Sequence, residues 1–497
     1  MLDVLRPHVA WGALYDSDKR MEEHATICQP ETRTKILNEI RSWADSRTTT
    51  PLCWLSGPAG TGKTTVAHTI AEEYDKRGQL AATFFFWRKT GDRDDIKKLV
   101  PTLAWQIATK VLSAQERMEE ALGLKNKAWV PLPESSLEDQ LSKLLVRGPI
   151  TDVNSAVPTL IVIDGLDECA SQGGIRRLIN WLRTNKPPFR FLLTSRPELQ
   201  IKAFFLPNGD GRSDAWSLSL TESRDDIRRY FVEELEKVWP RQLRVEDSGP
   251  SEWPLESHLN GLVENSEGLF IYAATAVLYI GGEGNAGERL KDVLKLHSGL
   301  DSLYRQVIGE ARRWDHFNIV MGSLMYLRYP LAVDELSMVL LNINNCLKSP
   351  VIRSALSGCH SILIIPANSN TKIESYHASL RDFLTDESRS QMLFYAPSVS
   401  HAQLLVGCLG AITRAFNNGT LAPKYALVSW YYHAVLFLSV SHTSEGLGGL
   451  RDKEGEELVK KIDLKWVKSW MAEALGWAGV PYLIWQVPPE KVRESNT

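Results

Sequence analysis

Short apolar runs alternate with amphipathic segments through the first half of the chain. Runs of strand length occupy residues 52–55, 83–87, 160–163, 191–194 and 216–220. Between them, apolar side chains recur at helical spacing, at residues 63–74, 96–112 and 175–182. Strands that are apolar on both faces and alternate with helices are typical of a parallel sheet with helices on both faces. We therefore expect an α/β domain over residues 51–221.

Helices are predicted on both sides of this domain. One amphipathic helix is expected at residues 32–43, within an N-terminal segment that spans residues 1–50. After the α/β domain, strand-like runs become rare and apolar residues return at helical spacing, which indicates a helical subdomain at residues 222–315.

The C-terminal part of the chain mixes helices with a small hairpin. Short β-like runs at residues 362–365 and 372–376 flank a polar turn, and with the helical segments around them they favour a winged-helix domain at residues 316–395. The remaining residues, 396–497, are predicted to form a helical tail. Within it, the aromatic-rich run at residues 425–441 is expected to be core, because polar residues interrupt it and no basic face flanks it.

The charge balance argues against a nucleic-acid partner. Lys and Arg number 57 and Asp and Glu number 60 in the 497 residues, for a net charge of −3. A chain with this balance has no global positive field to hold nucleic acid or an anionic membrane.

Other features of the sequence indicate a cytoplasmic protein. The six cysteines are scattered without a Cys-x-x-Cys pair, which is typical of reduced thiols and not of a zinc site. The first residues lack the apolar core of a signal peptide, and the most apolar stretch, residues 268–282, is too short to span a bilayer. We expect no membrane span.

A glycine-rich motif follows the first predicted strand. Residues 57–64 match G-x-x-x-x-G-K-[ST] at every fixed position, which happens by chance in about one chain of this length in fifty. Its place between a strand and a helix lets backbone N–H groups converge on phosphate oxygens. Lys63 is expected to meet the β- and γ-phosphates, and the Thr64 hydroxyl to complete a Mg²⁺ shell. The expected nucleotide contacts are Gly57, Pro58, Ala59, Gly60, Thr61, Gly62, Lys63, Thr64 and Thr65.

Acidic and basic residues follow two other predicted strands. Asp164 ends the strand at residues 160–163, where α/β sheets place their ligands, and it is the expected carboxylate on the Mg²⁺ side. Glu168 or Asp167 is expected to orient or deprotonate the attacking water. Arg196 follows the strand at residues 191–194 and is expected to sense the γ-phosphate.

The nucleotide base is predicted to be adenine. Guanine recognition by a G protein needs an Asn/Thr-Lys-x-Asp motif, and neither Asn-Lys pair, at residues 126–127 and 185–186, supplies the Asp. ATP and ADP with Mg²⁺ are therefore the expected ligands.

These motifs resemble those of the NACHT family, which are P-loop NTPases of the STAND class, and especially the nephrocystin-like NACHT proteins that are abundant in filamentous fungi. The resemblance covers most of residues 15–400. It implies a switch that ADP holds closed and that opens and self-associates when ATP replaces ADP, with slow, regulatory hydrolysis in innate-immune-like or nonself-recognition signalling. The matching segments are CWLSGPAGTGKTT at 53–65, TFFFWR at 83–88, TLAWQIA at 102–108, LIVIDGLDEC at 160–169 and FLLTSRPE at 191–198.

The resemblance also implies roles for single residues. It gives the catalytic role to Glu168 and not to Asp167, and it makes Arg196 the first sensor. The run YHASLRDF at residues 376–383 resembles the winged-helix motif whose His contacts the ADP β-phosphate in the closed state, which implies that role for His377. Where many relatives pack a Gly-x-Pro on the adenine, this chain has Phe270 in place of the Pro.

Switches of this kind usually place an effector domain before the NACHT module and sensor repeats after the helical tail. This chain has room for neither, so we expect protein partners to supply these functions. Two other classes stay open: a phosphoryl-transfer enzyme of the P-loop kinase type, and a scaffold that binds nucleotide without turnover. Glu168→Gln distinguishes a switch, which would lose turnover and keep ATP, from a scaffold, which would not change.

Overall fold

The computed structural model describes residues 2–17, 27–46, 50–88, 92–124, 135–146, 159–205, 215–220, 224–242 and 254–441. The part of the predicted tail at residues 442–497 lies outside these described residues. The chain divides into two compact units. The first unit is Met1–Val333 with Ser349–Phe394, and the second unit is Asp334–Lys348 with Tyr395–Thr497.

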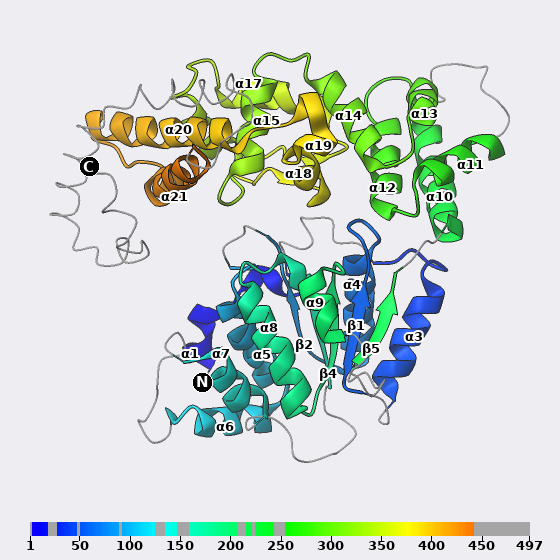
Figure 1. Ribbon diagram of the computed structural model, residues 1–497, viewed down its shortest axis with the longest axis vertical. Helices are drawn as coiled ribbons and strands as arrows, with labels where there is room; N and C mark the ends of the chain where they lie inside the picture. The colour runs from blue at the N-terminus through cyan, green and yellow to red at the C-terminus, as the bar shows by residue number, and fades with distance from the viewer. Residues whose placement is uncertain are drawn as a thin grey trace. The chain divides into compact units, whose positions relative to one another are not determined.

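Five strands of the described residues form one parallel sheet in the first unit (Figure 1). They are β1 (Leu52–Ser56), β2 (Leu80–Phe85), β3 (Leu160–Asp164), β4 (Arg190–Ser195) and β5 (Ala215–Ser219). Their order across the sheet is β2-β3-β4-β1-β5, and every neighbouring pair is parallel. The predicted parallel sheet is confirmed. Its carboxyl ends share one edge, which brings together the loops after β1, β3 and β4.

Helices cover both faces of this sheet, as the strand pattern predicts. Successive strand residues point to opposite sides, so Cys53 and Leu55 join one buried cluster with α3 and α4, while Trp54 joins another with α5 and α8. Truncating a buried Leu or Ile in such clusters costs about 2–5 kcal/mol. The helical elements of this domain are α1 (Leu2–Leu5), η1 (Arg6–His8), η2 (Trp11–Ala13), α3 (Thr34–Asp45), α4 (Lys63–Lys76), α5 (Ile96–Lys110), α6 (Leu112–Ala121), α7 (Leu137–Leu141), η5 (Ser142–Val146), η6 (Leu166–Glu168), α8 (Gln172–Asn185) and α9 (Leu199–Phe205).

The ends of several elements differ from the predicted ones, and two of these differences have a clear physical reason. β2 begins at Leu80 and not at residue 83, because the small residues Ala81 and Ala82 are buried and belong to the strand. The helix predicted at residues 96–112 is interrupted at Val111, whose extended backbone (φ −130°, ψ 102°) separates α5 from α6.

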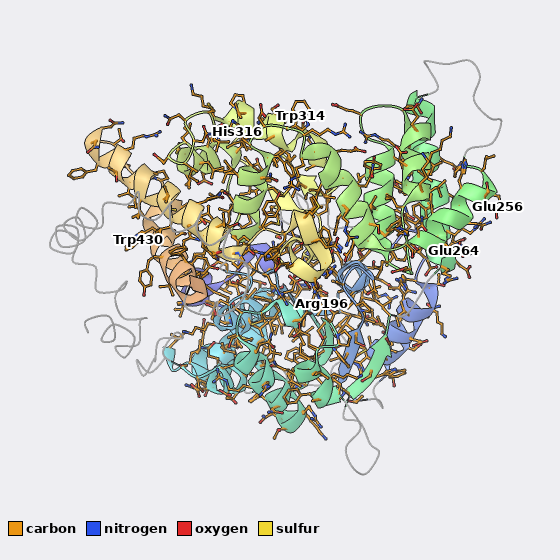
Figure 2. The ribbon with its side chains drawn as sticks, turned by 45° about the horizontal axis from the view of Figure 1, so that its top comes forward. Arg196, Glu256, Glu264, Trp314, His316 and Trp430 are labelled. Atoms are coloured by element: carbon orange, nitrogen blue, oxygen red, sulfur yellow. The ribbon has the colours of Figure 1, made fainter. Side chains whose placement is uncertain are left out.

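The described residues that follow the sheet in the first unit are mostly helical, as predicted. They form α10 (Arg224–Gln242), α11 (Glu256–Asn265), α12 (Phe270–Ile280), α13 (Ala286–Lys295) and α14 (Leu300–Ala311). Arg228 of α10 pairs with Glu256 and donates to Asn260, both on α11, and so ties these two helices together; Figure 2 labels Glu256. The first turn of α12 meets the glycine-rich loop, because the Ile271 N–H donates to the Gly60 carbonyl at 3.1 Å.

A small antiparallel strand pair lies where the hairpin was predicted. Leu363 pairs with Ser375 and Ile364 with Glu374. α16 falls within the predicted winged-helix range, but most of it belongs to the second unit, so the boundaries at residues 316 and 395 stay a prediction. The elements of this region are α15 (Phe317–Tyr326), α16 (Val333–Leu340), α17 (Ser349–Leu356), η7 (Ser357–Cys359), β6 (Leu363–Ile364), β7 (Glu374–Ser375), α18 (Ser379–Leu384), α19 (Glu387–Ser390) and η8 (Gln391–Leu393).

The second unit contains α20 (Pro397–Asn417) and α21 (Lys424–Ser441), which pack against each other. On the buried face of α21, His433 Nδ1 lies 2.9 Å from His401 Nδ1 of α20, and Tyr425 of the same helix hydrogen-bonds His433. Leu427 and Tyr431 are exposed, so only one face of the aromatic-rich run is core. In the described part of the chain no single helix is long and apolar enough to cross a bilayer; only the bent pair Glu387–Leu393 with Pro397–Asn417 reaches that length and composition together.

Candidate active site

The glycine-rich loop joins β1 to α4 and depends on two glycines with a left-handed backbone. Gly60 has φ +80° and Gly62, which precedes the first turn of α4, has φ +89°. A Cβ on Gly60 would lie 2.0 Å from Ile271 Cγ2 of α12, whereas a Cβ on Gly62 would meet nothing within 4 Å. The loop therefore packs against α12 at Gly60 and opens to free space at Gly62, where the N-terminus of α4 can receive an anion.

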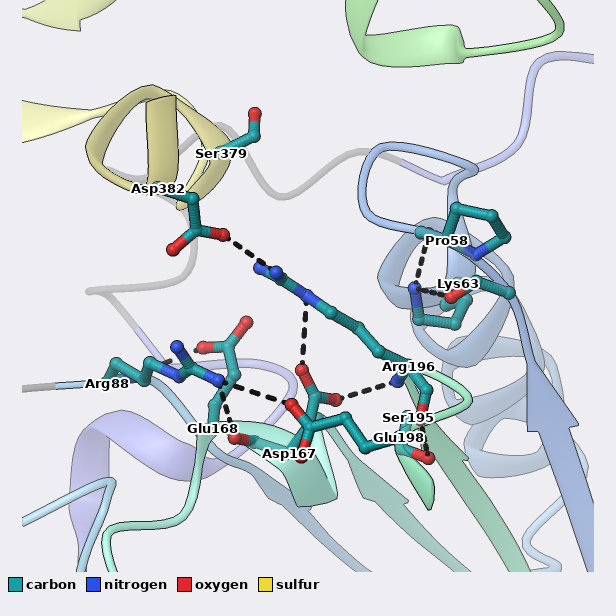
Figure 3. A network of polar contacts seen from close by, with 12 residues as sticks. Pro58, Lys63, Arg88, Asp167, Glu168, Ser195, Arg196, Glu198, Ser379 and Asp382 are labelled. Carbon is teal, nitrogen blue, oxygen red and sulfur yellow. Dashed lines mark hydrogen bonds and ion pairs between the residues drawn. The ribbon is translucent and has the colours of Figure 1, made fainter. Parts of the chain in front are cut away.

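Lys63 turns its ammonium back onto this loop. Its Nζ donates to the carbonyl oxygens of Gly57 and Pro58, both at 2.8 Å (Figure 3). Burial lowers the pKa of Lys63, and the nearby charges of Asp167 and Asp164 oppose that effect. The ammonium is thus held at the mouth of the loop by weak carbonyl acceptors, which a phosphate oxygen can replace.

The Asp164 carboxylate accepts hydrogen bonds from two neighbouring threonine hydroxyls. Thr64 donates to Asp164 Oδ2 at 2.9 Å, and Thr194 of β4 donates to Asp164 Oδ1. Asp164 is only 3% exposed, so a carboxylate is held in the interior by these bonds. Mg²⁺ prefers one or two protein oxygen ligands that phosphates and water complete. The Thr64 hydroxyl and the Asp164 carboxylate lie side by side and fit that requirement.

Asp167 and Glu168 lie on the same turn, η6, but have different partners. Asp167 accepts the backbone N–H of Arg196 at 2.9 Å and pairs with the Arg196 Nε at 3.3 Å. Glu168 Oε2 accepts the backbone N–H of Arg88 at 3.2 Å. Burial, and then the charges of Asp167 and Asp164, raise the pKa of Glu168 to about 7. Glu168 therefore has the proton affinity that a general base needs near neutral pH.

Arg196 connects the carboxyl edge of the sheet to a later part of the first unit. Its Nη1 donates to Asp382 of α18 at 2.7 Å, while its Nε faces Asp167 (Figure 3). Asp382 lies in the YHASLRDF run that was singled out for His377. One guanidinium thus bridges Asp167 of η6 and Asp382 of α18.

His377 lies near this pair, with one ring nitrogen already engaged. Its Nδ1 accepts the Ser379 backbone N–H at 3.1 Å and lies 2.7 Å from the Ser379 hydroxyl. Because Nδ1 accepts, the proton of the neutral ring is on Nε2. Burial, with the positive charges of Arg196 and Lys63, lowers the pKa of His377 to about 4. The ring is therefore neutral at physiological pH and offers an Nε2–H donor.

Phe270, which stands where many relatives have a proline, contacts Arg33 of the N-terminal segment. The Arg33 guanidinium lies 4.8 Å from the Phe270 ring centroid and donates to the Thr61 carbonyl at 2.6 Å. The Arg33 backbone N–H donates to Asp226 of α10. The segment before α3, the glycine-rich loop and α12 thus meet at Arg33.

Sequence reasoning brought together most of these residues but missed others. Lys63, Thr64, Asp164, Glu168 and Arg196 all lie at the carboxyl edge of the sheet. It did not assign roles to Arg88, Asp382 or Arg33. Three sequence features could have pointed to them. Arg88 directly follows the second apolar run, Asp382 comes five positions after His377, and Arg33 stands at the start of the helix before the glycine-rich loop.

Comparisons with known proteins agree with the first part of this picture. Residues 31–196 match the sequence model of a family described as Nephrocystin 3, N-terminal. This part of the chain is nephrocystin-like. The match contains the glycine-rich loop, the acids after β3 and Arg196, and it ends before His377. No curated protein matches the sequence significantly.

Solved structures match over longer stretches but only loosely. PCH-2 of C. elegans is 10% identical with a TM-score of 0.31 and covers 57% of this chain and 72% of its own. AMPPCP-bound DnaA from Aquifex aeolicus is 14% identical with a TM-score of 0.29, covering 80% and 98%. Drosophila ORC bound to DNA is 14% identical with a TM-score of 0.28, covering 62% and 76%. Superpositions of this quality carry no weight for function.

Proposed function

We propose that the chain is a nucleotide-dependent switch of the NACHT type that binds ATP and ADP with Mg²⁺ and hydrolyses ATP slowly. The observation that carries the proposal is the Arg196 guanidinium, which pairs with Asp167 in the nucleotide site and with Asp382 beyond it. A group that contacts both places can report the state of the nucleotide to the helices around Asp382.

The phosphates are proposed to enter the open side of the loop at Gly62. There the backbone N–H groups at the start of α4 converge, and Lys63 exchanges its carbonyl acceptors for phosphate oxygens. Mg²⁺ bound beside Thr64 and Asp164 would neutralise part of the phosphate charge. Arg33 and Phe270 lie where the loop meets α12 and are proposed to border the adenine.

Hydrolysis is assigned to Glu168. Its carboxylate takes a proton from water as the water oxygen attacks the γ-phosphorus, and the bond to the β–γ bridging oxygen breaks to give ADP and phosphate. Arg196 would stabilise the γ-phosphate charge only after leaving Asp382, so turnover is slow while the pair persists.

In the ADP state, the Nε2–H of His377 is proposed to donate to the β-phosphate and to hold the molecule closed. ATP would draw Arg196 from Asp382 and favour an open form that self-associates through the NACHT domain. Effector or sensor functions would come from protein partners in the cytoplasm. A scaffold that binds nucleotide without hydrolysis is the alternative; the wild type and Glu168→Gln would then both bind ATP and both lack turnover.

The first test is the nucleotide that the purified protein carries. The protein is denatured and the released nucleotide is identified by chromatography, for the wild type, Lys63→Ala and the control Lys76→Ala, an exposed lysine on the same helix that pairs with Glu72. We expect near-stoichiometric ADP in the wild type and in Lys76→Ala and none in Lys63→Ala. A wild type that arrives empty and whose melting temperature does not rise with Mg²⁺ and ATP would contradict the proposal.

A further inference from the structure

Arg88 follows β2 and lies against the turn that carries both acids of the site. The Phe86 N–H donates to the Asp164 carbonyl at 3.0 Å, so the end of β2 continues alongside the end of β3. Gly165 permits this approach, because a Cβ there would lie 3.3 Å from the Phe86 carbonyl oxygen. The chain after Phe86 is therefore fixed at contact distance from η6.

Arg88 contacts this turn with both its backbone and its side chain (Figure 3). Its backbone N–H donates to Glu168 Oε2 at 3.2 Å. Its guanidinium Nη2 donates to the carbonyl oxygen of Asp167 at 2.9 Å and lies 3.7 Å from Glu198 Oε1, just before α9. One residue thus joins the end of β2, the turn after β3 and the loop after β4.

These contacts fix the carboxylate of Glu168 in orientation. The Arg88 backbone N–H donates to Oε2 of Glu168, so Oε1 of Glu168 can accept a hydrogen bond from a water molecule. The guanidinium holds the peptide immediately before Glu168, so it limits rotation of the turn that aims the carboxylate. The side chain of Arg88 is 40% exposed, so its contacts contribute little to the core and can be removed without opening a cavity.

We propose that Arg88 is a positioning residue that aims the Glu168 carboxylate at the attacking water by holding the turn at Asp167. This inference rests on the proposed hydrolysis by Glu168. Arg88 itself touches neither water nor phosphate in this role, and its effect passes through Glu168. A misplacement of about 1 Å in a catalytic group can lower a rate by about 100-fold, so loss of the guanidinium is expected to lower turnover while leaving nucleotide binding intact.

The test compares steady-state ATP turnover in full-length variants with Mg²⁺. Arg88→Met keeps the length of the side chain without its donors, and Arg88→Lys keeps a donor and the charge. Arg176→Met is the control, since Arg176 is an exposed arginine of α8 whose guanidinium donates to Gln200. We expect kcat to fall about tenfold or more in Arg88→Met with KM within about twofold, Arg88→Lys to recover part of the loss, and Arg176→Met to match the wild type.

A double variant separates positioning from other roles. If Arg88 acts through Glu168, adding Arg88→Met to Glu168→Gln lowers the residual rate no further. A full additional loss in the double variant would overturn the inference, as would wild-type kcat in Arg88→Met. A wild type whose turnover equals that of Glu168→Gln would overturn the proposed hydrolysis and this inference with it, so the two failures are distinguishable.

Discussion

At the scale of single residues, neighbours decide the roles of chemically similar groups. Asp167 and Glu168 are adjacent acids, yet Asp167 is tied to Arg196 by two contacts while Glu168 receives one backbone N–H. Burial, and then the charges of Asp167 and Asp164, raise the pKa of Glu168 to about 7, so this carboxylate can accept a proton near neutral pH. This difference supports the proposal that Glu168, of the two acids expected from the sequence, acts as the base.

The pH dependence of turnover tests that assignment. A general base works in its ionised form, and the pKa of Glu168 is raised to about 7, so we expect turnover to rise with pH and to reach half its plateau near that value. Below it, the rate should fall about tenfold for each pH unit. Glu168→Gln should lower the plateau by about 100-fold or more and remove this dependence.

Turnover is measured from pH 5.5 to 9 with Glu264→Gln, an exposed acid of α11, as the control (Figure 2). A half-plateau near the ordinary glutamate range in the wild type would argue against Glu168 as the base, and so would an unaltered profile in Glu168→Gln.

At the scale of elements, the site depends on a contact between the glycine-rich loop and α12. The loop carbonyl of Gly60 accepts the Ile271 N–H, and no Cβ fits at Gly60 because Ile271 fills the space. The loop is therefore shaped by its own glycines and by a helix more than two hundred positions away in the sequence. Movement of α12 would change the loop that is proposed to hold phosphate.

Gly60→Ala should destabilise the protein much more than Gly78→Ala, although both glycines have a left-handed backbone. Gly78 has φ +68° and a Cβ there meets nothing within 4 Å, so Gly78→Ala measures the left-handed backbone cost alone, about 1 kcal/mol. Gly60→Ala adds overlap with Ile271 and should cost about 2–4 kcal/mol in total.

Thermal unfolding of both variants, with Gly60→Ala combined with Ile271→Ala as a third, measures the difference. We expect the double variant to lose less stability than the sum of its single changes, because Ile271→Ala removes the clashing atoms. Equal melting temperatures for Gly60→Ala and Gly78→Ala would mean that α12 does not press on the loop.

At the scale of the whole molecule, the sequence predicts what is local and misses what joins distant segments. The glycine-rich loop and Asp164 could be predicted because strand, loop and helix follow one another in a few residues, and the parallel sheet followed from continuous apolar runs. The pairs Arg88 with Glu168 and Arg196 with Asp382 could not, because their members lie 80 and 186 positions apart. Such pairs depend on the paths of loops, which hydrophobic periodicity does not encode.

The Arg196–Asp382 ion pair joins the candidate site to the helices around His377, so under the proposed switch its loss should alter nucleotide exchange. Asp382→Asn removes a short charged hydrogen bond, which is worth about 1.4 kcal/mol or more, and a change of that size in the closed form alone corresponds to about tenfold faster ADP release. Release of a fluorescent ADP analogue, chased with excess ATP, measures the rate, and light scattering follows self-association.

The control is Asp301→Asn, because Asp301 accepts two hydrogen bonds from Arg389, at 3.0 Å and 2.6 Å, and both residues lie outside the candidate site. Asp301→Asn should lose at least as much thermal stability as Asp382→Asn, but only Asp382→Asn should release ADP faster and assemble at lower ATP concentration. If both variants release ADP at the same rate as the wild type, Asp382 contributes only to the fold, and Arg196 does not need to separate from Asp382 in order to act on the nucleotide. The pair would then set neither the resting state nor the slow turnover, and the restraint on the closed form would have to come from the His377 contact alone.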